Sequence, residues 1–368
     1  MTDTAPEAVA AGAPDPDEAQ RAIEYCYQQD WSDGLPLVPV STPLVDQFLA
    51  TTSRAPDEII GSLEQVGRDC TVYLAAVNAA MAGCKPEYFP VVLAAFDALM
   101  RERAARGGGF QSTSGPAPLI VVNGPVRHEL GFNTSGGAFG PGFRPNMTIP
   151  RAIGLIVRNA FGIREHVLGQ ATQGVPGRWS ICIAENEEES PWEPLAANAG
   201  QPGGVSAVSA TLTRTCEFID NRATPVAEEV LRDFADTIGR LGPQIFPQTP
   251  VALVLCPEHA QQFAGSGYSK ADVQNWLIEH SGRTAGQMRR AGKGHVLRFP
   301  VGGNQPGFGA NADADAEPVS DEHFHRVLSE PRQIPVIVAG AKNAGISMVA
   351  RIFGEWSGIA TPVGEKIK

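Results

Sequence analysis

The fold is decided by residues 116–195. The most informative parts of this stretch read PAPLIVVNGPVRHELGFNTSGGAFGPGFRPNMTIPRAIGLIVRNAFG (116–162) and QGVPGRWSICIAENEEESPWEPL (173–195). The apolar run 119–122 stops at Asn123-Gly124-Pro125, which is typical of a strand covered on both faces. A glycine-rich loop of about 20 residues follows, far longer than the usual connection of about 4–6 residues. We therefore expect this loop to carry function.

The end of the loop predicts a helix that runs over residues 150–161. Thr148 is the expected N-cap, and a proline at 150 fits the first turn, where no backbone N–H is needed. A glycine-rich loop that leads into a helix N-terminus suits anions, because glycine lets backbone N–H groups approach a ligand and the helix end is partially positive. Arginine adds forked donors. The predicted ligand-binding residues of this segment are Ser135, Gly136, Gly137, Arg144, Asn146, Thr148 and Arg151.

Two nucleotide-binding patterns are missing from this segment, which narrows the kind of anion expected. It has neither the GxGxxG pattern of a dinucleotide-binding turn nor the Lys-Ser/Thr ending of a P-loop. We therefore expect no nucleotide and no other cofactor, but the carboxylate or phosphate of a small substrate. The alternative is a glycine-rich loop that only turns a corner.

Composition narrows the class of protein. Only 19% of the 368 residues are charged, below the usual share of about 25%, which indicates much buried surface and predicts a homo-oligomer. The 40 glycines and 30 prolines fit a loop-rich α/β enzyme better than a helical bundle. A net charge of −11 argues against nucleic acid as a partner.

Targeting and redox signals indicate a cytoplasmic protein. None of the six cysteines forms a CxxC pair, so neither a zinc knuckle nor a thioredoxin motif is present. No apolar stretch approaches the roughly 20 residues of a membrane span. The N-terminus has no basic region of the kind that starts a signal peptide, and we expect residues 1–16 to form a disordered tail.

The order of apolar runs predicts an α/β fold. Strand patterns at 119–122, 179–184, 205–212, 250–255 and 334–339 alternate with helical stripes, which favours mainly parallel sheets flanked by helices. A Gln-Pro-Gly-Gly segment at 201–204 suggests a boundary between two lobes, 17–200 and 205–368. Residues 302–316 are rich in glycine, asparagine and alanine and are expected to form a mobile loop. The predicted strands do not recur at a fixed spacing, so we predict no internal repeat.

Polar residues at two strand ends are the candidates for catalysis. In open α/β sheets ligands bind beyond the carboxyl ends of strands, where Asn123, Glu185 and Asn186 lie. Glu185 is a candidate general base, and His128, next to the glycine-rich loop, is the best-placed acid or base among the histidines. His128 is equally explained as a surface histidine without a role. No HExxH motif occurs, and no metal site is predicted.

A rival reading places a nucleophilic thiol at Cys84. This residue precedes a predicted helix and adjoins Lys85, and both features lower the pKa of a thiol. The alternative is a small apolar residue at a helix corner, because free cysteine is among the most buried residue types.

Several segments resemble a family of uncharacterised bacterial α/β proteins. The resemblance covers most of residues 31–367 and rests on WSDGLPLVP, MAGCKPEYFPVVLAA, VVNGP, GGAFGPGFRPNMTIPRA, ATQGVPGRWSICIAENEEESPWEPL and VIVAG. It implies a full-length, enzyme-like unit and supplies no catalytic residues.

Together these features predict a cytoplasmic hydrolase or lyase that acts on a small anionic organic molecule. One alternative is a thiol-dependent enzyme that uses Cys84. The other is a non-catalytic protein whose glycine-rich loop binds an anion or another subunit.

Overall fold

The computed structural model describes residues 15–241, 248–298 and 319–364. The strands in these ranges are β1 (Ile59–Leu63), β2 (Arg68–Thr71), β3 (Ala117–Asn123), β4 (Cys182–Ala184), β5 (Ala207–Asp220), β6 (Val251–Leu255), β7 (Gly282–Thr284), β8 (Phe324–Arg326), β9 (Val336–Val338), β10 (Ile346–Ile352) and β11 (Thr361–Pro362). The α-helices are α1 (Pro16–Gln28), α2 (Thr42–Leu49), α3 (Val72–Met81), α4 (Phe89–Arg101), α5 (Arg103–Arg106), α6 (Val126–Glu129), α7 (Arg144–Asn159), α8 (Leu195–Asn198), α9 (Ala227–Leu241), α10 (Pro257–Gly265), α11 (Lys270–His280) and α12 (Ala285–Arg290).

These elements build a mixed α/β fold around one seven-stranded sheet. The strand order is β4-β3-β5-β10-β6-β9, and β11 pairs with β5. The expected predominance of parallel pairs is wrong, because only β3–β4 and β6–β9 pair in parallel within this sheet. An apolar run shows that a strand is covered, but it carries no information on the direction of the neighbouring strand.

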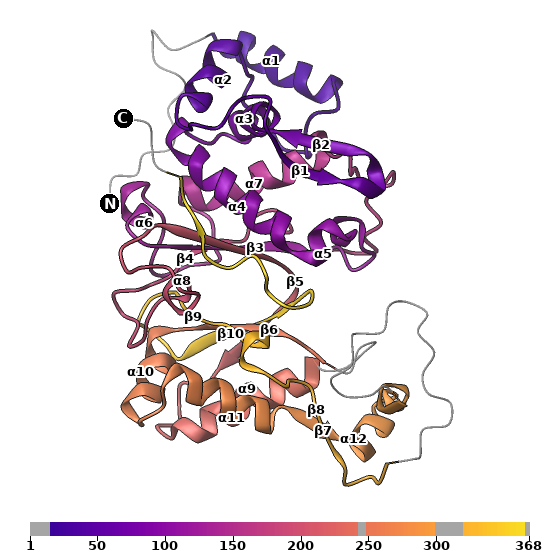
Figure 1. Cartoon of the computed structure of the whole chain (residues 1–368), viewed down its shortest axis with the longest axis vertical. Coiled ribbons are helices and arrows are strands. Elements are labelled where there is room, and N and C mark those ends of the chain that lie inside the picture. The colour runs from indigo at the N-terminus through magenta and orange to yellow at the C-terminus, as the bar shows by residue number, and fades with distance from the viewer. Residues whose placement is uncertain (1–14, 242–247, 299–318, 365–368) are drawn as a thin grey trace.

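The sheet lies between two groups of helices. Along β3 the side chains of Ile120 and Val122 face one hydrophobic cluster, which α3, α4 and α7 complete, while Leu119 and Val121 face a second cluster inside the curl of the sheet. The other half repeats this alternation, because Val254 faces the inner cluster while the neighbouring side chains of β6 pack under α9, α10 and α11. Figure 1 shows the two helical groups above and below the strands.

The two halves of the sheet have the same topology. β3 pairs in parallel with β4 and antiparallel with β5, just as β6 pairs in parallel with β9 and antiparallel with β10. The antiparallel pair β5–β10 lies at the centre and joins the halves. The two predicted lobes therefore share a single sheet, and the boundary at 201–204 stays a prediction about folding units.

The sheet curls so that its two edge strands, β4 and β9, come together at their ends. The edge strands β4 and β9 meet where both end: the Asn186 N–H donates to Val338 O (2.8 Å), and the Asn186 amide donates to Gly340 O (2.9 Å). The carboxylate of Glu185 accepts the Val338 N–H (3.3 Å). The outward N–H and C=O of Val338, at the end of β9, thus find partners on the two residues that follow β4.

The ends of the chain and one loop bear on the remaining fold predictions. Helix α1 begins at Pro16, and the Asp15 carboxylate caps it by accepting the Asp17 N–H at 3.0 Å. The rest of the predicted tail, residues 1–14, and the loop predicted at 302–316 lie outside the described residues. No helix in the described ranges is long and apolar enough to cross a membrane.

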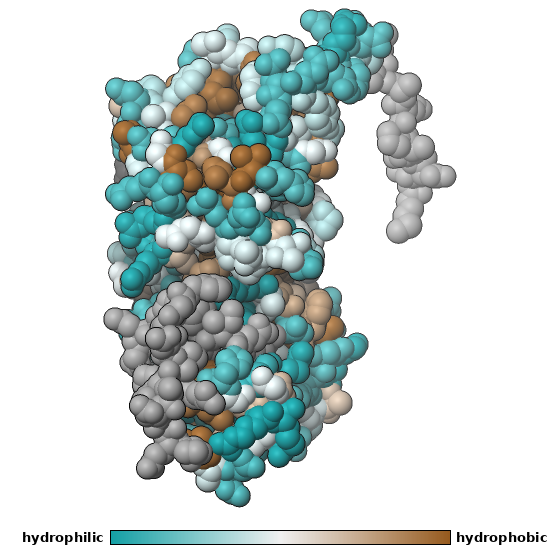
Figure 2. All heavy atoms as spheres, turned by 90° about the vertical axis from the view of Figure 1, so that its right-hand side faces the viewer, coloured by the Kyte–Doolittle hydropathy of each residue, from teal (hydrophilic) through white to brown (hydrophobic). Residues whose placement is uncertain are grey.

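The surface bears on the predicted homo-oligomer. On the coloured part of the face in Figure 2, hydrophilic residues predominate and hydrophobic ones gather in separate patches. This face does not by itself mark out an interface between copies, so the homo-oligomer stays a prediction.

Candidate functional site

The two arginines expected to hold an anion are already bound within the protein. The Arg144 Nε donates to Gly83 O at 2.8 Å. Arg151 grips the Asp33 carboxylate with two bonds of 2.9 Å and also donates to Leu35 O and Pro36 O at 3.1 and 3.0 Å. The Arg151 guanidinium also holds the pKa of Asp33 down against the effect of burial, which raises it. Arg151 therefore ties the WSDGLP segment to α7.

Thr148 is not the N-cap of the helix, so this prediction is wrong. Helix α7 starts four residues earlier, at Arg144, and Phe143 occupies the N-cap position without a side-chain bond. Thr148 lies inside the helix, where its hydroxyl donates to Arg144 O at 2.8 Å. Pro150 also lies inside the helix, and Pro145 is the proline of the first turn. The prediction selected the wrong proline as the start signal.

Asn146 ties the glycine-rich loop to the sheet. Its side-chain oxygen accepts the Asn133 N–H and its amide donates to Cys182 O, both at 2.9 Å. Within the loop Asn133 accepts the Ser135 N–H at 3.0 Å and donates to Gly136 O at 2.9 Å. Asn146 is buried, so its polar groups serve the fold, while Ser135, Gly136 and Gly137 lie on the exposed part of the loop.

Glu185 and Asn123 are brought together, as expected, but deep in the protein. The fully buried Glu185 Oε2 accepts from the Asn123 amide (2.7 Å) and from the Leu195 N–H (2.8 Å). Burial raises the pKa of Glu185, and the Lys270 ammonium and the hydrogen bonds oppose that rise. Together with the bond to Val338, these contacts join the residue after β4 to the ends of β3 and β9 and to the start of α8. The geometry assigns the Glu185 carboxylate a structural role.

His128 belongs to a surface ion cluster. Its Nε2 lies 3.0 Å from Glu188 Oε1, and both side chains are more than half exposed. The Arg127 guanidinium forks onto the same carboxylate at 3.0 and 3.1 Å and holds the pKa of Glu188 at about 2. Nothing in this cluster holds His128 over a cavity.

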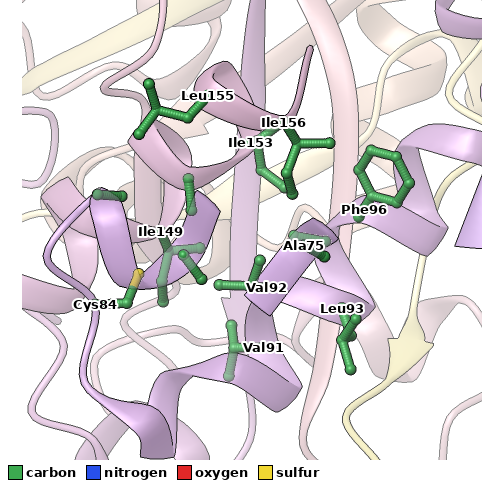
Figure 3. Packing of buried hydrophobic residues seen from close by; sticks show 14 of the residues in the cluster. Ala75, Cys84, Val91, Val92, Leu93, Phe96, Ile149, Ile153, Leu155 and Ile156 are labelled. Atoms are coloured by element: carbon green, nitrogen blue, oxygen red, sulfur yellow. The ribbon is translucent and has the colours of Figure 1, made fainter. Parts of the chain in front are cut away.

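Cys84 is packed in the hydrophobic cluster beneath α3, α4 and α7. It is 5% exposed, and Figure 3 shows it among labelled neighbours such as Ile149 and Val92. Burial raises the pKa of its thiol to about 12, against the lowering that the sequence predicted. The helix corner and the nearby Lys85 do not compensate for the loss of water around the thiolate.

We therefore expect Cys84 to react slowly with iodoacetamide at neutral pH, because only the thiolate reacts and almost none is present. Peptide mapping after timed alkylation should show labelling of Cys84 mainly after denaturation. Cys216, which is half-buried, serves as the comparison. Labelling of native Cys84 ahead of Cys216 would restore the thiol nucleophile predicted at this position.

A cavity of about 270 Å³ lies between the glycine-rich loop and the turn that follows β9. Residues 136–140 form one wall, and the turn after β9, residues 339–341 and 343–344, forms another. The remaining lining comes from β5, β6 and β10 and their ends: Phe218, Val254, Cys256, Ile346, Ser347 and Met348. None of these lining residues carries a charge. The predicted loop residues Gly136 and Gly137 therefore do border a cavity, but its lining has no cationic side chain to bind an anion.

Equivalent positions in the two halves of the sheet carry different side chains. The registers Val122–Ala184 and Leu255–Val338 are equivalent, so the next residues along each pair are Asn123 with Glu185 and Cys256 with Ala339. In the first half an amide and a carboxylate fill this position. In the second half a thiol and a methyl group take the same places and leave room.

Two polar residues of the cavity lining, Cys256 and Ser347, contact the buried His259, which lies behind them. His259 Nδ1 lies 2.7 Å from Ser347 Oγ, and its Nε2 lies 3.0 Å from Asn221 O. Ser347 Oγ lies 3.5 Å from Cys256 Sγ and accepts the Cys256 N–H at 2.9 Å. The pairing of β6 with β10 brings Ser347 to Cys256, while His259 follows in the first turn of α10.

The charge states of the three groups follow from burial. Burial lowers the pKa of His259 below its ordinary 6.5, so the imidazole is neutral at pH 7. Burial also raises the pKa of the Cys256 thiol, with Ser347 acting in the opposite direction. The cluster at rest therefore holds a neutral base and a protonated thiol.

Comparisons of the chain with family models, curated proteins and solved structures found no match. Among the described residues no group of three or more histidine, cysteine, aspartate or glutamate side chains is placed to hold a metal ion.

Proposed function

We propose that the protein is a hydrolase that acts on a small organic molecule in the cavity between the glycine-rich loop and the turn after β9. The observation that carries the proposal is the contact of 2.7 Å between the buried His259 and Ser347, a residue that lines this cavity. Hydrolases that use a side-chain nucleophile need a base within hydrogen-bond reach of it and a third group that orients the base. Asn221 O is that third group here.

The same contact favours hydrolysis over elimination. The base Nδ1 of His259 faces a hydroxyl of the protein, and Ser347, not His259, lines the cavity. A lyase would need its base to reach a proton of the substrate directly. His259 instead acts through a neighbouring side chain, which suits the activation of a nucleophile.

The substrate that this cavity favours is uncharged and partly apolar. Phe139, Val254 and Met348 line it, and the two arginines expected to bind an anion are engaged elsewhere. The proton-transfer role predicted for His128 and Glu185 belongs to His259 in this proposal. Free thiols at all six cysteines fit a reducing compartment, so a cytoplasmic location remains part of the proposal. The homo-oligomer is kept on the low share of charged residues alone.

Replacing His259 tests the proposal. For the full chain with p-nitrophenyl esters of short fatty acids, we expect His259→Ala to lower kcat/KM by about 100-fold or more, the usual effect of losing a general base. The control is His280→Ala, since His280 is an exposed histidine of α11. In the wild type kcat/KM should rise with pH and level off below pH 6.5, because the base works only when neutral and burial lowers its pKa.

Two results would contradict the hydrolase. Ester hydrolysis that survives in His259→Ala would remove the base from the mechanism. Binding of a small molecule without turnover, detected by calorimetry, would favour the alternative of a non-catalytic binding protein. Circular dichroism of each variant separates either result from a loss of fold.

A further inference from the structure

The thiol of Cys256 occupies the position of a nucleophile in this cluster. It lies at the N-cap of the nine-residue helix α10 and accepts the His259 N–H at 3.5 Å. Like Ser347, Cys256 lines the cavity. A helix N-terminus favours negative charge on a thiol once it has lost its proton. The site therefore joins a thiol, a hydroxyl and an imidazole to an apolar space of about 270 Å³.

The direction of the hydrogen bonds follows from the one partner that can only accept. Asn221 O has no proton to give, so His259 Nε2 carries the hydrogen of that bond. In a neutral imidazole Nδ1 is then the acceptor, and it takes the single hydroxyl hydrogen of Ser347 at 2.7 Å. With its only hydrogen on His259, the Ser347 hydroxyl has none to give to the Cys256 sulfur 3.5 Å away, so a hydrogen shared by these two atoms is that of the thiol. A continuous path leads from the sulfur through the hydroxyl to the base.

We propose that Cys256 is the catalytic nucleophile and that the substrates are small uncharged esters with an apolar acyl group. This inference rests on the proposed hydrolase function. The sulfur forms a bond to the acyl carbon while the thiol proton passes through Ser347 to His259 Nδ1. As the carbon–oxygen bond of the ester breaks, that proton goes to the departing alkoxide and leaves a thioester on Cys256.

The second half of the reaction restores the thiol. A water molecule adds to the acyl carbon and gives a proton through Ser347 to His259. The carbon–sulfur bond then breaks, the carboxylic acid leaves, and the proton returns along the same path to the sulfur. The balance is one ester and one water consumed, and one acid and one alcohol released.

The apolar lining defines the acyl group. Phe139 comes from the glycine-rich loop, Val254 from β6 and Met348 from β10, and Val254 and Met348 are register partners in neighbouring strands. They surround the space next to Cys256 with hydrocarbon. A short alkyl chain gains from leaving water there, whereas a carboxylate would lose its hydration without a cationic partner among the lining residues.

The experiment traps the thioester. The full chain is mixed with p-nitrophenyl butyrate, quenched with acid after a few turnovers, and examined by intact mass and peptide mapping. We expect one butyryl group per chain on Cys256, together with a burst of p-nitrophenol of matching size. Cys256→Ala and Cys256→Ser should abolish the burst and the adduct on this peptide. Cys216→Ala, which alters a half-buried cysteine of β5 outside the cavity lining, should keep both.

The outcomes separate this inference from the proposed function. Hydrolysis that depends on His259 but persists in folded Cys256→Ala, or an acyl group mapped to Ser347, would overturn the thiol nucleophile and leave the hydrolase standing. The absence of both ester hydrolysis and adduct in the wild type would overturn both proposals. Succinate monoesters, which add a carboxylate to the acyl group, should react at least 10-fold more slowly than butyrate; equal rates would overturn the uncharged substrate class.

Discussion

Replacing Glu185 with alanine is expected to lower the free energy of unfolding by about 3–5 kcal/mol, the usual cost of removing one member of a buried charged network. The substitution leaves the Asn123 amide and the Leu195 and Val338 N–H groups without their common acceptor in the interior. It also leaves the Lys270 ammonium without the carboxylate that opposes its desolvation. The closing contact between the two edge strands loses one of its bonds at the same time.

Matched variants separate the network from the loss of charge. Glu189→Ala removes an exposed carboxylate of the same acidic run and should change the free energy of unfolding by less than about 0.5 kcal/mol. The loss of stability in Glu185→Gln should lie between those of the other two variants. The glutamine amide keeps one acceptor oxygen, but its NH2 group replaces the other oxygen and faces the donors of the network. Urea unfolding followed by fluorescence measures all three. A Glu185→Ala protein as stable as Glu189→Ala would show that the carboxylate is not the tie described above.

Glu102 should make the stability of the protein depend on pH. This carboxyl is 1% exposed and accepts the Ser357 and Gly358 N–H groups, both at 2.6 Å. Burial raises its pKa from 4.5 to about 7 despite these bonds. The native state thus keeps a proton that the unfolded chain has lost, and the contribution of this group to stability is complete below pH 4.5 and lost as the pH rises through about 7.

The neutral isostere should remove this dependence. Glu102→Gln keeps an oxygen for the two N–H groups, so its stability relative to the wild type should increase from pH 4.5 to pH 8 by up to about 3 kcal/mol. Glu18→Gln, on the exposed side of α1, controls for the loss of a surface charge. Unfolding midpoints in urea across this pH range give the comparison. A constant difference between Glu102→Gln and the wild type would mean that the native carboxyl titrates as it does in the unfolded chain.

Much of the local structure could be predicted from the sequence, because it depends on neighbouring residues. The strands expected at 119–122 and 250–255 are β3 and β6. The direction of the strands could not be predicted. An apolar run is the same whether its neighbour runs parallel or antiparallel, so the antiparallel centre of the sheet has no local signal.

The candidate site shows the same limit. Cys256 and His259 follow directly after a predicted strand, and that position was visible in the sequence. Ser347 joins them only because β10 pairs with β6, and the hydroxyl is 88 residues from the histidine. In the other direction, the strand ends that hold Asn123 and Glu185 were predicted to form a crevice. Instead the Asn123 amide donates to the Glu185 carboxylate at 2.7 Å, and both side chains are buried.

The meeting of β4 and β9 bears on how the protein avoids aggregation. Strands at the edge of a sheet carry free peptide groups that can capture another chain by strand addition. Here both edge strands are only three residues long, and Glu185 and Asn186 take up the outward N–H and C=O of Val338. A chain that loses this contact exposes the unpaired peptide groups of both edge strands at once. Damage at Glu185 should therefore lead to insoluble assemblies at protein concentrations where simple unfolding would remain reversible.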